Sequence, residues 1–408
     1  MADVLSPGWI GPVRLRNRIV KAATYEGLSH RGLVTRDLVD FHVRCARGGV
    51  GMTTVAYLAV SRDGRTDRHQ VCWADEAMPG LRHLTEAVHR EGAAVSAQIG
   101  HAGPVAYRAP ALAPSRRFNL AGRGFSRAIG KADIDRVVAA HARAARLAVE
   151  AGFDAVEVHL GHNYLASSFL SPALNDRDDE YGGSLENRAR FARDTMRAVR
   201  DAVGDRIAIL AKLNMDDGYP GGFGLDEAIP VACWLEADGT VDALEMTAGS
   251  SLRNPMYLFK GDVPIREFAA VMPGPVKLGV RLVGRRFLRR YPYRDGYLLE
   301  DARKVRAEVR LPMLLLGGVT GRAVMDRAMA EGFEFVAMAR ALLRQPDLPR
   351  LIAADPATPS LCTHCNKCMP TNYTGVRCAL VEPASPRSGS WGTPAGYVPR
   401  QASAWSER

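Results

Sequence analysis

Short apolar runs alternate with longer amphipathic segments along most of the chain. The runs are rich in Val, Ile, Leu and Ala and lack polar alternation, which is typical of strands buried on both faces of a parallel sheet. They predict eight strands, over Ile19–Thr24, Val50–Val60, Ala94–Gly100, Ala155–Leu160, Arg206–Asn214, Ala243–Thr247, Met313–Gly317 and Phe335–Ala339.

The segments between these runs carry the periodicity and end signals of helices. Asp133 and Ser184 are placed to cap helix starts, and Gly92, Gly152 and Gly332 follow helix ends. The predicted helices are Arg36–Arg47, Met78–Glu91, Ala132–Ala151, Ser184–Val203, Leu225–Ala237, Leu299–Glu308 and Arg322–Glu331.

Eight strand–helix units in succession predict an α/β fold, a (β/α)8 TIM barrel. A doubly wound open sheet would need a Gly-rich dinucleotide loop after its first strand, and no such motif occurs there. The segment 250–298 is too long for an ordinary connection, so it is expected to be an insertion after strand 6, over the barrel mouth. The predicted domains are a barrel over 1–355 and a Cys-rich C-terminal extension over 356–408. The tail after Arg387, rich in Gly, Ser and Pro, is expected to be extended.

Composition narrows the class of protein. The 408 residues are 47% hydrophobic and 24% charged, as in globular proteins. Since the chain lacks an apolar run of 18 residues and an apolar signal core at its start, we expect no transmembrane segment and a cytoplasmic location. We also expect the protein to form a homo-oligomer.

The net charge is +10, and the arginines that dominate this excess are spread through the chain; the one dense block is the stretch 281–294, which holds six of them. No nucleic-acid-binding motif accompanies it, so no nucleic-acid partner is expected. The stretch is either a solvated basic loop or a contact for an anionic substrate tail or a membrane surface.

The strongest candidate for chemistry lies at the end of the fourth predicted strand. His159 is close to the end of that strand, His162 follows three residues later, and Tyr164 two after that. Functional side chains of TIM barrels lie at the carboxyl ends of strands and in the loops that follow. A lone histidine here would be interpreted as a core residue, but the His-x-x-His pair favours a functional site.

Five motifs connect the chain to a known family: NRIVKAAT at 17–24, QIGHAGP at 98–104, HLGHNYL at 159–165, LGGV at 316–319 and MARALLRQP at 338–346. In this order they resemble the old yellow enzyme family of FMN-dependent ene-reductases. Within it, the chain is most similar to the flavin barrels of 2,4-dienoyl-CoA reductase and trimethylamine dehydrogenase. The resemblance runs from about Val4 to Cys378. It implies FMN, NADH or NADPH as reductant, and a small unsaturated carbonyl compound as substrate.

The resemblance also implies roles for the strand-end residues. His159 and His162 would hydrogen-bond the activating oxygen of the substrate and stabilise charge there as hydride arrives at the β-carbon. Tyr164 matches the family's proton donor, and a phenol with a pKa near 10 stays protonated at neutral pH. Together these roles imply that the protein is an NAD(P)H:flavin oxidoreductase that reduces activated C=C bonds.

Eight positions match the family's flavin-binding residues. Ala23 and Thr24 would line the ring, and the amide of Gln98 would pair with its polar edge. Tyr25 stands where trimethylamine dehydrogenase attaches its flavin through cysteine, so we expect non-covalent FMN. The remaining matches, at the ring or the phosphate, are Lys212, Gly317, Gly318, Ala339 and Arg340.

Lys212 departs from the family, which commonly has arginine at this position beside the flavin. Lysine keeps the positive charge but loses the planar fork of donors. The alternative is that Lys212 pairs with a carboxylate inside the barrel, and Glu157 and Glu245 are the candidates.

Cys362, Cys365, Cys368 and Cys378 resemble the [4Fe–4S] ligands of the two larger relatives, with a shorter final spacing. Four thiolates suit an iron–sulfur cluster or structural zinc, and the absence of any metal is a third possibility. The relatives carry a further nucleotide-binding domain, whereas this chain ends about 30 residues after Cys378. A second hypothesis follows from this, an amine- or steroid-type flavin dehydrogenase that passes electrons through the cluster to a separate carrier protein.

Overall fold

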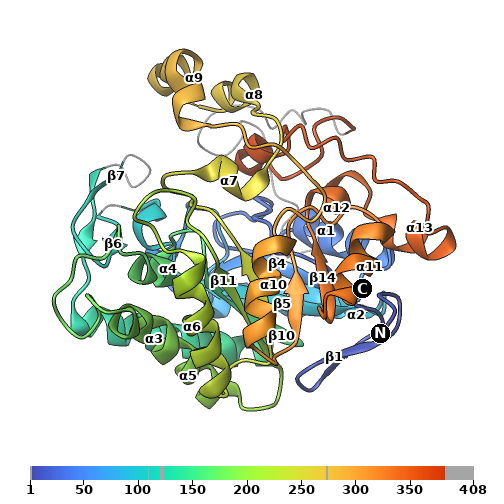
Figure 1. Ribbon diagram of the computed structural model, residues 1–408, viewed down its shortest axis with the longest axis horizontal. Coiled ribbons are helices and arrows are strands. Elements are labelled where there is room, and N and C mark those ends of the chain that lie inside the picture. Colours follow the sequence, from blue (N-terminus) through green and yellow to red (C-terminus); the bar gives the residue numbers. More distant parts are fainter. Residues whose placement is uncertain (1, 109, 120–123, 273, 382–408) are drawn as a thin grey trace.

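The computed structural model describes residues 2–381, except 109, 120–123 and 273, so the predicted extended tail lies outside the described residues. Eight parallel strands close a barrel at the centre of the molecule, which confirms the predicted TIM-barrel fold (Figure 1). In order around the barrel they are β3 (Ile19–Lys21), β4 (Met52–Ala59), β5 (Ala94–Gly100), β10 (Ala155–Leu160), β11 (Ala208–Asn214), β12 (Ala243–Thr247), β13 (Met313–Leu315) and β14 (Phe335–Met338).

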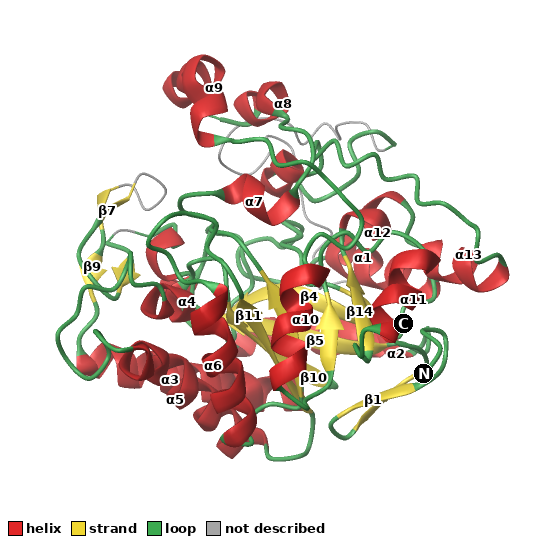
Figure 2. Ribbon diagram, viewed as in Figure 1, coloured by secondary structure: helices red, strands yellow, loops and turns green. Residues whose placement is uncertain are grey.

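Helices surround this barrel, as Figure 2 shows. Seven match the predicted ones with end shifts of at most two residues, because their apolar faces pack on the strands. They are α1 (Arg36–Arg47), α2 (Met78–His89), α3 (Lys131–Glu150), α5 (Leu185–Val203), α6 (Leu225–Ala237), α10 (Leu299–Glu308) and α11 (Arg322–Ala330). After β14 follow α12 (Arg340–Arg344) and α13 (Leu348–Ala354).

The two predicted helix caps have different outcomes. Ser184 caps α5, since its hydroxyl accepts a hydrogen bond from the backbone N–H of Asn187. The prediction for Asp133 was wrong: Gly130 is the cap of α3, and Asp133 lies in its first turn. There its carboxylate is 2.7 Å from the Arg127 guanidinium, an ion pair between residues six apart that the sequence pattern does not reveal.

Several predicted strands extend too far at their ends. β3 ends at Lys21, and the following residues leave the sheet for the barrel mouth. β13 ends at Leu315, because Gly317 and Gly318 have φ values of 95° and 78° that no strand accommodates. These shortened ends produce the loops in which the predicted cofactor residues lie.

The amino end of the barrel is closed by a hairpin that the sequence analysis did not predict. Its strands are β1 (Gly8–Ile10) and β2 (Val13–Leu15), each three residues long. Ile10 and Leu15 are buried in a cluster with inward-facing strand residues such as Leu210 and Phe335. This apolar layer leaves the opposite, carboxyl end of the barrel for polar side chains.

The insertion after β12 and the C-terminal extension lie at that carboxyl end. The insertion carries α7 (Pro255–Phe259), α8 (Ile265–Ala270) and α9 (Gly274–Phe287), and α8 and α9 project furthest from the barrel in Figure 1. The extension contains the 3-10 helix η4 (Met369–Tyr373) and joins the loop after β3, where the N–H of Val376 donates to the carbonyl of Glu26.

The remaining elements are short and lie in the loops: α4 (Leu165–Leu170), the strand pairs β6 (Leu112–Ala113) with β9 (Arg127–Ala128) and β7 (Phe118–Asn119) with β8 (Gly124–Phe125), and the 3-10 turns η1 (Arg62–Gly64), η2 (Asp75–Ala77) and η3 (Gly103–Val105). Within the described part of the chain, no helix has both the length and the apolar character needed to cross a membrane.

Candidate active site

The fold brings His159, His162 and Tyr164 into one cluster at the carboxyl end of β10. The ring centroid of His159 lies 5.0 Å from that of His162 and 4.7 Å from that of Tyr164. The chain reverses here because His162 and Asn163 both have left-handed backbone conformations, with φ values of 60° and 57°. Such a conformation is uncommon for residues other than glycine and is often found at functional sites.

The protonation states of this cluster suit hydrogen-bond donation. Burial, together with the charge of Lys212, lowers the pKa of His162 to about 3. Burial also lowers the pKa of His159 well below its usual value, with His162 and Lys212 adding to the effect. Burial raises the pKa of Tyr164. At neutral pH both imidazoles are therefore neutral with one N–H each, and Tyr164 keeps its proton.

A buried network orients His162. Its Nε2 is 2.8 Å from the hydroxyl of Thr247, and its backbone N–H donates to Oδ1 of Asn214 over 3.4 Å. Asp217, fully buried, accepts hydrogen bonds from the side chains of Asn214 (2.8 Å) and Asn163 (3.0 Å). The sequence analysis missed these three residues, Thr247, Asn214 and Asp217, although two of them end predicted strands.

Below the histidines, the barrel interior holds a layer of buried polar and charged groups. Nζ of Lys212 lies 2.9 Å from Oε1 of Glu157 and 2.8 Å from Oε1 of Glu245. Gln98 donates to the same oxygen of Glu157 over 2.6 Å. Two residues predicted to contact the flavin, Gln98 and Lys212, therefore meet at Glu157. The pairing of Lys212 with Glu157 and Glu245 is the alternative considered from the sequence.

This layer contains one lysine and two carboxylates, so its charge does not balance. Burial opposes the charge of Lys212, but Glu157 and Glu245 together raise the pKa of the lysine. Burial raises the pKa of Glu245 to about 7, even though Lys212 opposes this shift. The lysine stays charged, and Glu245 holds a proton over part of the neutral pH range.

The unfolding free energy is expected to fall with rising pH because of Glu245. Its folded pKa of about 7 lies above the usual 4.5, so the folded state binds more protons between these values and loses stability as pH rises through that window. We expect this group to contribute about 1–3 kcal/mol of that decrease. Urea unfolding of the wild type and Glu245→Gln at pH 5, 6, 7 and 8 measures the contribution. Equal pH slopes in the two proteins would contradict this assignment.

One predicted cofactor residue, Thr24, and one predicted catalytic residue, His159, have features that fit a bound ligand. The Thr24 hydroxyl and Nδ1 of His159 are buried and have no hydrogen-bond partner within the described residues. Buried polar atoms need such partners, so both suit contact with a bound molecule. Tyr25, next to Ala23 and Thr24, pairs through its backbone with Ala56. The predicted contacts of Ala23 and Thr24 with the flavin ring stay predictions.

The predicted phosphate residues lie in the loops after β13 and β14. A side chain at Gly318 would come within 2.7 Å of the backbone nitrogen of Gly296, so only glycine allows this close approach. The guanidinium of Arg340 donates to the carbonyl of Lys260 over 3.0 Å and to the side chain of Asn366. In this structure Arg340, which follows Ala339 at the start of α12, joins the barrel to the insertion and the extension.

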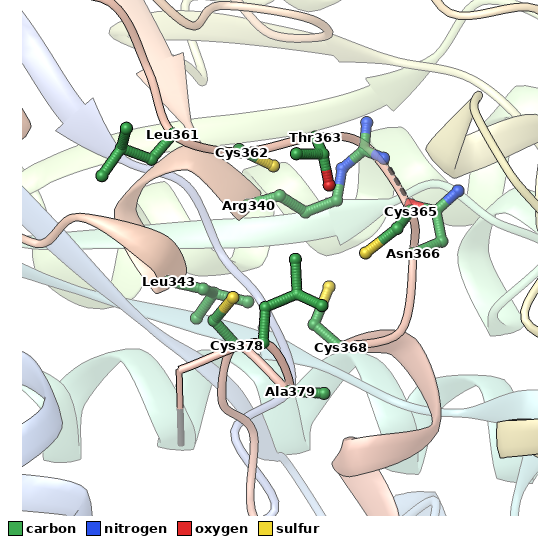
Figure 3. A pocket seen from close by; sticks show the side chains of 11 residues that line it. Arg340, Leu343, Leu361, Cys362, Thr363, Cys365, Asn366, Cys368, Cys378 and Ala379 are labelled. Atoms are coloured by element: carbon green, nitrogen blue, oxygen red, sulfur yellow. Dashed lines mark hydrogen bonds between the residues drawn. The ribbon is translucent and has the colours of Figure 1, made fainter. Parts of the chain in front are cut away.

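The four clustered cysteines line a single pocket, shown in Figure 3. Arg340 also lines this pocket. None of the four cysteines forms a disulfide. Burial raises the pKa of Cys368 to about 12, which disfavours the free thiolate. Within the described residues, no three His, Cys, Asp or Glu side chains converge in a way that would hold a single metal ion.

Comparisons with known proteins place this arrangement in context. The model of the NADH:flavin oxidoreductase / NADH oxidase family matches residues 3–252. A 4,4'-dithiodibutanoate disulfide reductase of Rhodococcus erythropolis is 51% identical over 95% of this chain and 98% of its own. A metal reductase of Desulforamulus reducens is 31% identical over 90% of this chain but only 51% of its own.

Solved structures give the same picture of the fold. A 2-naphthoyl-CoA reductase in complex with 2-naphthoyl-CoA has a TM-score of 0.76 and 25% identity, over 89% of this chain and 54% of that one. The present chain therefore spans about half the length of this reductase and of the metal reductase. A morphinone reductase, at 22% identity and a TM-score of 0.66, shares the fold over 88% of this chain.

Proposed function

The chain belongs to the NADH:flavin oxidoreductase / NADH oxidase family and is an oxidoreductase; from this premise we propose that it reduces carbon–carbon double bonds conjugated to a carbonyl group. The family implies FMN as cofactor and NADH or NADPH as reductant. The observation that carries the proposal is the cluster of two neutral imidazoles and one protonated phenol at the end of β10.

Each member of the cluster has a separate task in this reaction. The N–H groups of His159 and His162 hold the carbonyl oxygen and stabilise the negative charge that develops on it. Tyr164 donates its proton to the α-carbon, while the β-carbon gains a hydride, so the double bond is saturated and the phenolate is then reprotonated from water. Bound FMN would supply the hydride from its reduced ring.

The 51%-identical relative supports a second candidate, the reduction of an organic disulfide. In that reaction the S–S bond accepts a hydride and a proton, and two thiols form. The printed activity of that relative concerns a small dicarboxylate disulfide. The same three side chains serve it, since Tyr164 could protonate the leaving thiolate and the imidazoles could hold an anionic group.

Anaerobic reoxidation of the reduced holoenzyme separates the two candidates. The flavin spectrum is followed after cyclohexenone, an enoyl thioester or 4,4'-dithiodibutanoate is added. We expect rapid reoxidation by at least one unsaturated carbonyl compound and the saturated product in stoichiometric amount. If only the disulfide reoxidises the flavin, the ene-reductase proposal fails and the second candidate takes its place.

The cysteine pocket is proposed to hold an iron–sulfur cluster. Its donor set of four thiols matches the ligand number of such a cluster, and the same donor set would also suit structural zinc. Iron, acid-labile sulfide and zinc analysis of the purified protein tests this. Iron and sulfide that are lost together in Cys365→Ser would support it, and stoichiometric zinc would refute it. An iron–sulfur cluster at this position would be consistent with the second hypothesis, in which electrons pass from the flavin through the cluster to a separate carrier protein.

A further inference from the structure

Helix α9 and the residues just after it have an unusual composition. The stretch 274–290 contains no acidic and no uncharged polar side chain. It consists of glycine, proline, apolar residues and six cations, Lys277, Arg281, Arg285, Arg286, Arg289 and Arg290. A surface helix of a globular protein normally presents a mixed polar face to water.

The apolar side chains of this helix are largely exposed. Leu282 is 75% exposed, Val283 63% and Leu278 60%, and Val276 and Phe287 are about half exposed. Five large apolar side chains on one 14-residue helix form more than the scattered exposure that is normal for a protein surface. By helical spacing, Val276, Val283 and Phe287 lie on one side of the helix and Leu278 and Leu282 on another. Exposed apolar surface of this extent marks an interaction site.

The base of the helix contacts the rest of the insertion and the C-terminal extension. Gly284 is buried and faces the side chain of Ile265 in α8, and Leu288 is buried in a cluster with Met256 and Met369. Arg290 forms an ion pair with Asp262 over 3.0 Å. The insertion thus holds one side of α9 against α8 and leaves the remaining circumference uncovered by the described residues.

We propose that α9 docks the protein on an anionic phospholipid surface. Its exposed aliphatic side chains would enter the boundary between headgroups and acyl chains, and its arginines would bind the phosphates. Cations lie between the apolar positions around the helix, which suits a fluid surface better than a protein partner with fixed hydrogen-bonding groups. A second copy of this basic helix would be repelled by its charge.

Docking of this kind would orient the candidate active site. The insertion follows β12, and α8 and α9 project beyond α7 from the carboxyl end of the barrel (Figures 1 and 2). The mouth of the barrel would then face the bilayer, where apolar unsaturated substrates concentrate. This consequence rests on the proposed function, but the docking itself does not.

Vesicle flotation with the full-length holoenzyme tests the proposal. Vesicles of phosphatidylcholine alone are compared with vesicles that contain one quarter phosphatidylglycerol, at low and high salt. We expect binding to the anionic vesicles only, weakened by salt. Replacement of Arg281, Arg285 and Arg286 by Gln should weaken it roughly a hundredfold, about fivefold for each arginine. Leu282→Asp should abolish it at either salt concentration.

The matched control replaces three exposed arginines at the opposite end of the barrel, Arg14, Arg90 and Arg310, by Gln, with the same change in net charge. Equal loss of binding in this control would overturn the proposal, since general charge would then explain it. Absence of wild-type binding to anionic vesicles would also overturn it. A third outcome would also overturn the proposal: the α9 arginine changes raise the KM for an acyl-CoA substrate and have no other effect. The helix would then hold a substrate tail.

Discussion

Tyr164→Phe is expected to lower kcat for an unsaturated carbonyl substrate by about 100-fold to 10,000-fold, the range that a positioned proton donor contributes. The phenol lies 4.7 Å from the His159 ring, centroid to centroid, and burial keeps it protonated. Since the hydroxyl is the only group removed, the two imidazoles should still bind the carbonyl oxygen. The measurement is the rate of flavin reoxidation by substrate in stopped flow, beside the rate of flavin reduction by NADH or NADPH.

The matched control for this variant is Tyr57→Phe. The Tyr57 ring packs 5.3 Å from that of Tyr164, but its hydroxyl donates to the backbone carbonyl of Gly64 and so has a structural partner. We expect Tyr57→Phe to lower the rate of reoxidation little, and both variants to be reduced by nicotinamide at the wild-type rate. Equal reoxidation rates in Tyr164→Phe and wild type would exclude Tyr164 as the proton donor.

Lys212→Met is expected to reduce the free energy of unfolding by about 3–5 kcal/mol, the usual cost of removing one partner from a buried ion pair. Lys212, Glu157 and Glu245 are all almost completely buried, and the lysine lies within 3 Å of an oxygen of each carboxylate. Without it, two carboxyl groups would share an apolar interior with no counter-ion. Urea unfolding at pH 8, above the pKa of about 7 that burial gives Glu245, measures the loss.

Two further variants separate this electrostatic effect from loss of packing. Lys212→Arg keeps the charge and should retain most of the stability. Lys212→Met combined with Glu245→Gln removes one carboxylate as well, so the double variant should be more stable than Lys212→Met alone. A double variant that is as unstable as the sum of the two single changes would indicate independent packing defects and would contradict the charge assignment.

The sequence by itself determined the fold class and most of the helices and strands, because local residue patterns specify these elements. Buried parallel strands leave continuous apolar runs, and helices leave a 3.6-residue period, so the barrel and its seven main helices followed directly. The His159, His162 and Tyr164 cluster was also accessible, because all three residues come from one strand and its loop. Asp133 was assigned wrongly, since its partner Arg127 depends on how the chain enters α3.

Other features depend on residues far apart in the chain, and only the tertiary structure decided them. From the sequence we predict that Lys212 contacts the flavin, with an internal ion pair as the alternative. The strand register sets Lys212 opposite Glu245 and opposite His159, two residues after Glu157, and its Nζ forms ion pairs with both carboxylates. Closure of the barrel brings Thr247 and Asn214 to His162. The sequence showed the stretch 281–294 only as a cluster of positive charge. The structure showed that α9 projects from the barrel and that its apolar side chains are exposed, which indicates an interaction surface. Burial and long-range contact arise from packing, which a local sequence pattern does not specify.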